Sequence, residues 1–534
     1  MSEPAKKQSF LHGAALLAVA TAIVKVIGAL YKIPLKMVIG DQGYSYFCTA
    51  YDIYSVLLMI STTGLPVAMS RMISQSSALG HYRQVRRVYT TSRAIFIGLG
   101  LVSTLLMMVF CHQLAAFQKQ PDSWFAILCL GPCALLMGLL STYRGFFQGQ
   151  GNMIPTSVSQ VLEAVCKLLV GLVAAIVIAK YTNSVALAAG GAILGVTASC
   201  VLSAGYLMRC CRSAYAVLPK TEESVLSFGA TTRQLLSIAV PITIGSAGLQ
   251  ILTVLETNLY MGQLLGSNGL SADTAETMNG IYKMALTIYN MPISFFAPIT
   301  ISIIPAITAH LTLMNNRGVR ATEESAARIT GLLSLPCAVG LMVLSGPIMA
   351  LLGGYSGEKL QLASMLLALL GISVFLHAVV QLTNAIMQAH NHAKAPVVNM
   401  LLSGIMKLVV VYILSGNPSI GILAVPVGTA LCNLCIAILN LFVMRRYVPQ
   451  KPAIVKNVLR SFLPTAIMGV AVFLVQQGIV ALLGSDTSSI LLCGIPIAVG
   501  GCIYLISAVV LKSITREDCL LLPKGEKLAK LLHL

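Results

Sequence analysis

The sequence predicts an all-α membrane protein that crosses the bilayer many times, and three observations support this class. Of its 534 residues, 57% are hydrophobic and only 10% are charged, whereas soluble proteins carry about 25% charge. The mean hydropathy is +0.85. The apolar runs continue over about twenty residues, the length of a spanning helix, whereas β-barrel strands alternate over about ten. These features exclude a soluble enzyme, a disordered protein and a secreted disulfide scaffold.

Fourteen apolar runs are long enough to be membrane spans. In chain order they cover residues 10–38, 44–69, 93–117, 124–143, 156–179, 184–208, 234–260, 278–312, 329–352, 360–386, 397–415, 421–444, 461–484 and 488–511. The first and eighth runs are longer than one span requires, so we expect them to tilt or bend. Candidate bend points are Pro34, Pro292, Pro298 and Pro305.

The loop charges predict the orientation of these spans. Alternate loops hold 26 lysines and arginines, whereas the loops between them hold three, namely Lys119, Lys180 and Lys359. Cytoplasmic loops carry the excess of basic residues. Both termini are therefore expected in the cytoplasm. The mixed basic and apolar segment from Lys512 to Leu534 is either a surface helix on the anionic inner leaflet or a loosely ordered tail.

An internal repeat relates two parts of the chain. Gln148 precedes Lys167 by 19 residues, Gln388 precedes Lys407 by 19, and a proline lies between the two residues of each pair. The matched segments lead into spans 5 and 11, an even offset of six that preserves orientation. The repeat predicts a 6+6+2 layout. Its parts are an N-terminal lobe at 1–220, a C-terminal lobe at 221–446, and spans 13 and 14 with a cytoplasmic tail at 447–534.

The sequence lacks the motifs of several other functions. It has no ATP-binding loop, no zinc-protease motif and no hydrolase serine motif, so we expect a transporter without catalytic residues. The basic residues follow membrane topology, which argues against a nucleic-acid partner. The cysteines inside apolar runs, such as Cys432 and Cys435, are expected to pack as small hydrophobic residues. We therefore expect no metal site.

Nine charged residues fall inside the expected spans. They are Lys25, Lys32, Lys36, Asp52, Glu163, Lys167, Glu256, Lys283 and Lys407. Each would cost about 2.5–3.5 kcal/mol or more in lipid at the bilayer centre, so they should face the protein interior or a wet cavity. With six cations and three acids, this interior suits a phosphate or pyrophosphate group better than a cationic drug.

The cations differ in their expected depth and pairing. Lys25, Lys32 and Lys36 form one stripe on the first helix, with Lys25 near mid-depth and Lys36 near the outer surface, where a lysine can snorkel. Glu163 and Lys167 have the i, i+4 spacing of a favourable ion pair. They are either an internal salt bridge or part of a substrate site.

Four residues of this set remain, two lysines and two acids. Lys407 has no acid on its own helix, which favours a functional role. Asp52, Glu256 and Lys283 are expected in the outer half of the membrane. There they either pair with one another or bind a coupling cation.

Several motifs resemble a known family. They are G-A-L-Y-K-I-P-L (Gly28–Leu35), A-Y-D-I-Y (Ala50–Tyr54), G-L-P-V-A-M-S-R (Gly64–Arg71), Y-R-G-F-F-Q-G-Q-G-N-M-I-P-T (Tyr143–Thr156) and S-Q-V-L-E (Ser159–Glu163). The chain resembles the polysaccharide-biosynthesis branch of the MOP exporter superfamily, especially the stage V sporulation protein B group. This group is related to the MurJ-type lipid II flippases.

The resemblance implies a MATE-like fold with two six-helix lobes and a central cavity. It implies a flippase in the bacterial plasma membrane that moves an undecaprenyl-pyrophosphate-linked oligosaccharide or peptidoglycan precursor by alternating access. Spans 13 and 14 would shape a groove for the polyprenyl tail. The implied partners are the lipid-linked anionic substrate, membrane lipids and cell-wall synthesis enzymes.

The residues expected at the site fall into two groups. Five cations would attract the pyrophosphate: Lys25, Lys32, Arg71, Lys167 and Lys407. Three acids would position these cations or bind coupling Na⁺ or H⁺: Asp52, Glu163 and Glu256. No other cofactor is expected.

Two alternatives remain open. A MATE-type secondary antiporter would export small amphiphiles or drugs. Glu256 resembles the cation-site acid that some MATE members carry in span 7, but span 10 has only His377 and no acid. A non-transporting scaffold for cell-wall enzymes would not need charges inside the membrane.

Overall fold

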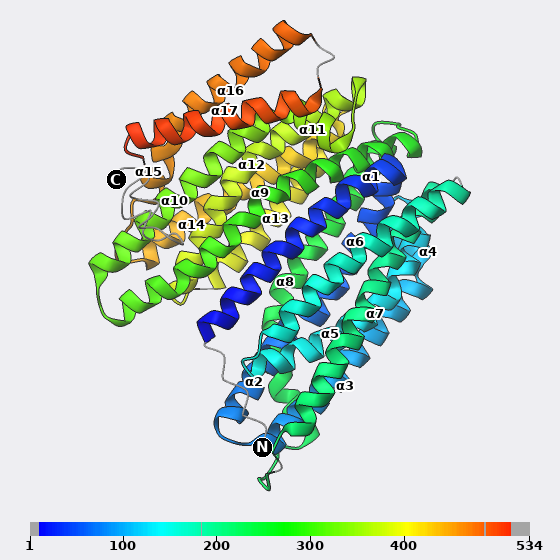
Figure 1. The fold of residues 1–534 in the computed structure, drawn as a ribbon, viewed down its shortest axis with the longest axis vertical. Helices are drawn as coiled ribbons and strands as arrows, with labels where there is room; N and C mark the ends of the chain where they lie inside the picture. The colour runs from blue at the N-terminus through cyan, green and yellow to red at the C-terminus, as the bar shows by residue number, and fades with distance from the viewer. Residues whose placement is uncertain (1–9, 183, 220, 393, 485–487, 514–534) are drawn as a thin grey trace. The chain divides into compact units, whose positions relative to one another are not determined.

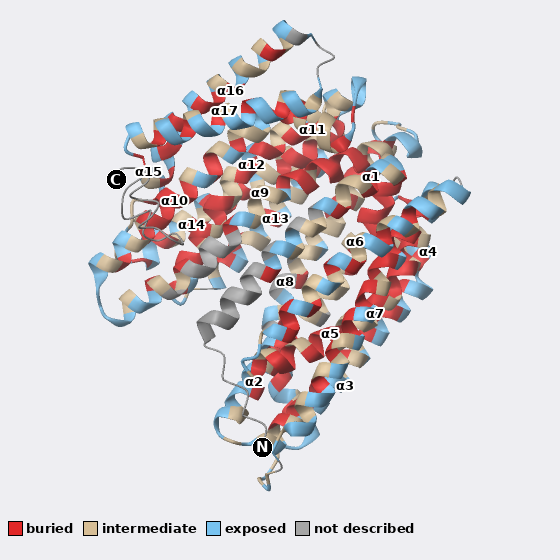
Figure 2. Ribbon diagram, in the orientation of Figure 1, coloured by how far each residue is buried: buried red, intermediate tan, exposed pale blue. Residues whose placement is uncertain are grey.

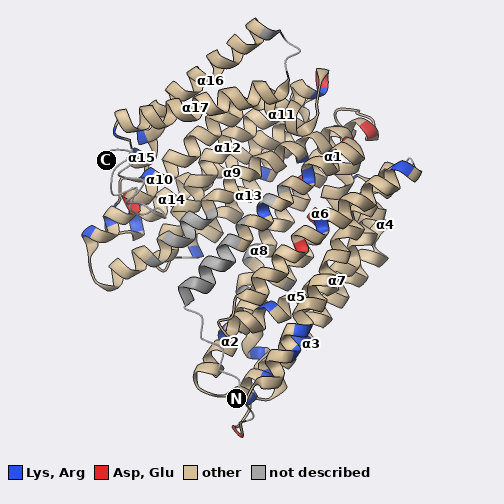
Figure 3. Ribbon diagram, viewed as in Figure 1, with Lys and Arg blue, Asp and Glu red and all other residues tan. Residues whose placement is uncertain are grey.

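The computed structural model describes residues 10–182, 184–219, 221–392, 394–484 and 488–513, and these residues are almost entirely helical (Figure 1). Eleven helices in the described part are long and apolar enough to cross a membrane. The polytopic α-helical class is thereby confirmed, and the count of fourteen spans stays a prediction. The tail after residue 513 lies outside the described residues. Long helical stretches carry no charged residue (Figure 3).

The chain divides into two compact units, Met1–Gly280 and Ile281–Leu534. The division falls inside helix α9 (Ala272–Thr312), so α9 contributes residues to both units. The expected lobe boundaries near residues 220 and 446 follow from the repeat and stay predictions.

Unit 1 consists of eight complete helices, a short 3₁₀ turn and the start of α9. The elements are α1 (Phe10–Thr62), α2 (Gly64–Ala78), α3 (Tyr82–Val109), α4 (Cys111–Phe117), η1 (Pro121–Ser123), α5 (Trp124–Gly149), α6 (Ile154–Thr182), α7 (Val185–Val217) and α8 (Phe228–Leu265). Buried residues concentrate on the faces that these helices turn toward one another (Figure 2).

Helix α1 is a hairpin of two helical arms that meet at Gly40. Gly40 has φ 69° and ψ −174°, which is not helical. The rings of Tyr31 and Phe47 lie 6.0 Å apart, although sixteen residues of straight helix would separate them by about 24 Å. The chain therefore reverses at Gly40, as expected between the first two spans.

The second expected span, residues 44–69, is not one uninterrupted helix. Helix α1 ends at Thr62, and α2 begins at Gly64. Pro66 has no backbone N–H and cannot donate to the carbonyl of Thr62, which explains a break at this point. Helix α2 then continues to Ala78, beyond the expected end.

Close backbone contact joins α6 to α7. A Cβ added to Gly195 of α7 would lie 2.2 Å from the Cα of Gly171 on α6. Small residues let membrane helices approach in this way. This contact fixes the rotation of α6, the helix that carries Glu163 and Lys167.

A buried hydrogen-bond network holds the start of α9 within unit 1. Asn279 donates to Ser45 at 2.7 Å and accepts from Tyr260 at 2.6 Å. Tyr46 donates to Glu276 at 2.5 Å. The network joins α1 and α8 to the first two turns of α9.

Unit 2 contains the remainder of α9, eight further helices and two 3₁₀ turns. The elements are α10 (Asn316–Val343), α11 (Ser345–Gly353), α12 (Gly357–Ala389), α13 (Lys394–Ser415), η2 (Gly421–Leu423), α14 (Ala424–Tyr447), α15 (Ile454–Val458), η3 (Leu459–Ser461), α16 (Phe462–Leu483) and α17 (Ser489–Val510). Helices α16 and α17 pack on α10 and α11 through Met468, Val472 and Leu344. Tyr504 of α17 also donates to the carbonyl of Leu332 at 2.6 Å.

The two repeat segments have the same turn geometry. Between α5 and α6, Gly151 donates to the carbonyl of Gln148 at 3.1 Å, and between α12 and α13, Asn391 donates to Gln388 at 3.1 Å. Gly151 and Asn391 both have positive φ, at 75° and 63°. Because glycine and asparagine are the residues that adopt this conformation most readily, the turns support the internal repeat.

The repeat lysines also lie at the same position along their helices. Helix α6 begins at Ile154 and Lys167 follows thirteen residues later; α13 begins at Lys394 and Lys407 again follows thirteen residues later. The matched position supports the proposal that the two lysines have related roles.

Candidate substrate site

Lys167 lies over two aromatic rings in the interior of unit 1. Its Nζ is 4.8 Å from the ring centroid of Tyr51 and 5.3 Å from that of Tyr31. The two tyrosines come from the two arms of the α1 hairpin. Among the described residues no carboxylate forms an ion pair with Lys167. Aromatic faces stabilise the ammonium group but do not cancel its charge.

Lys32 is the second predicted cation that the structure brings to this place. It follows Tyr31 on α1, is half-buried, and lies within electrostatic range of Lys167. Two like charges repel more strongly where little water screens them. An anion placed beside both lysines would relieve this repulsion.

Glu163 is paired, but its partner is not Lys167. Arg144 of α5 donates to Glu163 at 2.9 Å and to Ser159 at 3.1 Å. Ser159 and Glu163 are one helical turn apart, so a single guanidinium reaches both. Of the two alternatives for this pair, the direct Glu163–Lys167 salt bridge is therefore wrong, and Glu163 acts on Lys167 only at longer range.

The stripe on helix α1 is only partly as expected. Lys36 is buried, and its Nζ lies 3.2 Å from Oδ1 of Asp41. The expectation that Lys36 snorkels to the outer surface is wrong, because the turn at Gly40 brings Asp41 back to it. Lys25 is exposed, and Lys32 is half-buried.

The other predicted cations lie elsewhere. Arg71 is exposed on α2 and forms no ion pair within the described part of the chain. Lys407 is half-buried on α13 of unit 2, beside Gly428 of α14. No contact places either of them with Lys167.

The remaining charged residues of the expected spans, two acids and one lysine, are largely buried. Asp52 is half-buried on α1, and Glu256 is buried on α8; both have interaction partners. Lys283 is buried on α9 in unit 2 and lies 6.0 Å from the ring of Tyr282. The described residues contain no group of three or more metal-ligating side chains. A coupling cation stays a prediction.

Sequence reasoning missed three residues of this site. From its position after the expected span 124–143, Arg144 is predicted to be a loop cation, although it lies in the Y-R-G-F-F motif. Tyr31 and Tyr51 lie in the motifs G-A-L-Y-K-I-P-L and A-Y-D-I-Y. Because both motifs lie in apolar runs, neither tyrosine stands out as a polar site residue. Tyr31 donates to the carbonyl of Ala192 at 3.1 Å, whereas the buried hydroxyl of Tyr51 has no partner among the described residues. Tyr51 is therefore able to bond a ligand.

Unit 2 has its own polar interior. Asn440 of α14 donates to Thr383 at 2.9 Å and to Asn384 at 2.8 Å, both on α12. On the same helix, Gln381 and His377 are in contact at 2.9 Å.

Long apolar helices that enclose charged side chains, some of them without an ion-pair partner in the described part of the chain, are typical of a polytopic membrane protein. The fold is that of the MOP superfamily. Two solved structures share this fold. One is an inward-facing multidrug resistance MATE family transporter of the MOP superfamily, with a TM-score of 0.64, 16% identity, and coverage of 80% of this chain and 99% of that one. The other is the lipid II flippase MurJ in an inward closed conformation, with a TM-score of 0.68, 13% identity, and coverage of 93% and 99%.

The chain belongs to the polysaccharide biosynthesis protein family, whose pattern matches residues 10–310. It is 25% identical over 521 residues to stage V sporulation protein B of Bacillus subtilis (strain 168), covering 97% of this chain and 98% of the relative. It is also 25% identical over 520 residues to lipid II flippase MurJ of the same strain, covering 93% and 94%. The resemblance noted in the sequence is confirmed.

Proposed function

We propose that this protein is a flippase that moves an undecaprenyl-pyrophosphate-linked oligosaccharide or peptidoglycan precursor across the bacterial plasma membrane by alternating access. The observation that carries the proposal is the ammonium group of Lys167. It lies inside a membrane bundle within electrostatic range of Lys32 and Glu163. Among the described residues no carboxylate forms an ion pair with it, because Glu163 pairs with Arg144. A relative named as a lipid II flippase supports the proposal.

The chemistry of the site fits a pyrophosphate head group. Lysine provides a point charge that binds phosphate without a fixed geometry. Tyr51 contributes a ring that faces Lys167 and a buried hydroxyl group that has no hydrogen-bond partner among the described residues. Arg144 neutralises Glu163, so this acid does not repel an entering anion.

The proposed topology has fourteen spans and cytoplasmic termini. Under it, Lys407, Lys25 and Arg71 attract the same head group at other stages of transport. Asp52 and Glu256 bind or sense coupling Na⁺ or H⁺. Helices α16 and α17, which lie outside the repeat, hold the polyprenyl tail in an apolar groove.

The second candidate function is a MATE-type antiporter of small amphiphiles or drugs. The shared fold with a multidrug transporter favours it. The cations at the candidate site do not, because Lys32 and Lys167 together raise the energy of a cationic drug. The flippase is therefore the better-supported reading.

Depletion of the protein in its native bacterium tests the proposal. The cytoplasmic leaflet should then accumulate a polyprenyl-pyrophosphate lipid whose head group identifies the cargo. The lipids would be extracted and identified by mass spectrometry, with a re-expressing strain as the control. Unchanged polyprenyl-linked lipids, together with increased retention of cationic dyes, would instead support the antiporter.

A further inference from the structure

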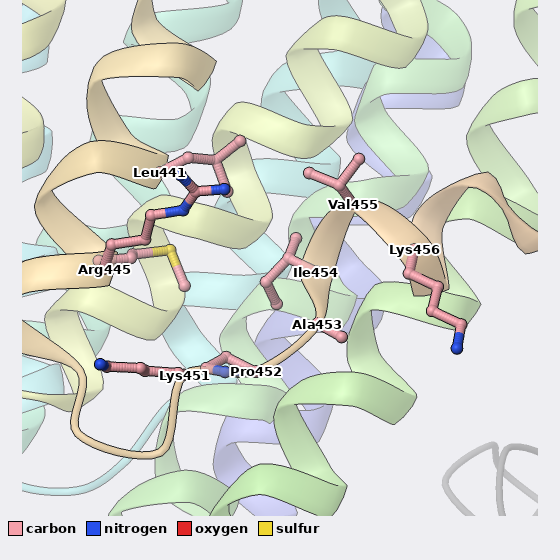
Figure 4. A pocket seen from close by; sticks show the side chains of 9 residues that line it. Leu441, Arg445, Lys451, Pro452, Ala453, Ile454, Val455 and Lys456 are labelled. Carbon is pink, nitrogen blue, oxygen red and sulfur yellow. The ribbon is translucent and has the colours of Figure 1, made fainter.

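A basic cavity in unit 2 contains none of the residues proposed for transport. It has a volume of about 400 Å³ and lies between the end of α14, the linker 448–453 and α15. Its cations are Arg445, Lys451 and Lys456, and its apolar wall includes Leu441, Met444 and Ile454. Figure 4 shows Arg445 and Lys451 on one side of the cavity and Lys456 on the other.

The three cations have no acidic partner in the described part of the chain. The acid that contacts the linker, Glu324, accepts from the backbone N–H of Ala453 at 3.2 Å and already pairs with Arg320 at 2.8 Å. Among the residues that the structure describes, the cavity lining contains no acidic side chain. It is therefore a place of net positive charge with room for an anion.

The cavity also lies at the polar end of an apolar helix face. Along α14, large apolar side chains are exposed at intervals of three or four residues, so they share one face: Leu431, Leu434, Ile438 and Phe442. Arg445 follows at the next interval on the same face. An amphiphile lying along this face would have its chains on the apolar side chains and its head group at Arg445.

The linker beyond the cavity continues the same arrangement. Val455 is exposed on α15, and Phe462 and Leu463 are exposed at the start of α16. Lys451 and Lys456 alternate with these apolar side chains. Basic residues mixed with exposed apolar ones are typical of a segment at an anionic membrane surface.

We propose that this cavity binds the phosphate head group of an anionic membrane phospholipid, whose acyl chains lie along the exposed face of α14. Arg445 and Lys451 bind the phosphate, and Lys456 closes the other side. A soluble phosphate compound shares the head-group chemistry, but it would leave the exposed apolar face of α14 unused.

The test uses the full chain in nanodiscs that contain equal amounts of phosphatidylglycerol and phosphatidylcholine. Native mass spectrometry then measures which lipids the released protein retains. The wild type should retain phosphatidylglycerol in preference. In the double variant Arg445→Gln, Lys451→Gln the apparent affinity for phosphatidylglycerol should fall about tenfold, which corresponds to about 1.4 kcal/mol.

The matched control is the double variant Arg446→Gln, Lys394→Gln. It removes the same charge from two exposed residues that do not line the cavity, and it should retain phosphatidylglycerol like the wild type. Equal losses in the two double variants, or no loss in either, would overturn the proposal. Unchanged melting temperatures would show that both variants are folded.

A competition arm separates the two sources of phosphate. Inorganic pyrophosphate at millimolar concentration should not displace phosphatidylglycerol from the wild type. Full displacement that requires Arg445 and Lys451 would assign the cavity to a soluble phosphate and overturn the lipid assignment. All of these outcomes are independent of the flippase proposal, because none of them measures transport.

Discussion

At the scale of the residue, partners decide which interior charges remain available to a ligand. Glu163 and Lys36 both have ion-pair partners, at 2.9 and 3.2 Å. Lys167 instead has two aromatic faces. The sequence could predict that these charges lie inside the bundle, because charge in lipid is costly. It could not predict the partners, because Arg144 and Asp41 reach them through helix packing and a turn.

Replacement of Lys167 by alanine should reduce transport at least tenfold. A hydrogen bond to a charged group contributes about 1.5–3 kcal/mol, and each 1.4 kcal/mol corresponds to a factor of ten. The measurement is the initial rate of lipid translocation in proteoliposomes. Lys180→Ala is the control, because Lys180 is exposed in the last turn of the same helix. Equal rates for wild type and Lys167→Ala would remove Lys167 from the site.

Glu276 should make stability depend on pH. It is buried just before the expected eighth span; burial raises its pKa to about 6, and Asp122 and Asp273 add to the rise while the Tyr46 hydrogen bond opposes it. Because the folded state favours the protonated acid, stability should fall as the pH rises from about 4.5 through 6. Melting temperatures between pH 4.5 and 7 would show this fall.

Glu276→Gln is the matched variant for that titration. Its melting temperature should match that of the wild type at low pH, exceed it at pH 7, and change less between the two. A wild type and a variant with parallel pH profiles would show that Glu276 does not titrate in this range.

At the scale of the element, one glycine determines how α1 brings both Tyr31 and Tyr51 to Lys167. The apolar runs predicted two spans here, because their lengths match a bilayer. They did not predict the break at Thr63, which follows from a proline inside the second run. Boundaries set by a single backbone position are hard to derive from hydrophobicity alone.

Gly40→Ala should destabilise the protein by about 1–3 kcal/mol. The φ of 69° with ψ of −174° is a region that glycine alone adopts readily. No atom lies within 4 Å of the added Cβ, so the cost is conformational. Thermal unfolding in detergent would measure it.

The control for that variant is Gly28→Ala, since Gly28 is helical and also has open space around its Cβ position. This substitution should be neutral or stabilising by about 0.5–1 kcal/mol, because alanine is the better helix former. A loss of the same size in both variants would argue against a special role for the turn.

At the scale of the whole molecule, composition and the length of the apolar runs predicted the class, and the structure and the family confirm it. The repeat was visible as two glutamine–lysine pairs and reappears as two turns with the same hydrogen bonds. The candidate site was predicted less fully. The structure brings the predicted cations Lys32 and Lys167 within electrostatic range of each other, and their role at a substrate site stays a prediction. Tyrosine in an apolar run gives no sign that it faces a lysine.

The central claim is that the protein moves a lipid with an anionic pyrophosphate head group. The most direct measurement is translocation of a fluorescent undecaprenyl-pyrophosphate-linked substrate in proteoliposomes that contain the purified full chain, compared with protein-free vesicles. The flippase proposal predicts protein-dependent translocation of this lipid and no exchange of ethidium for Na⁺ or H⁺. Exchange of ethidium, with no translocation of the pyrophosphate lipid, would contradict it.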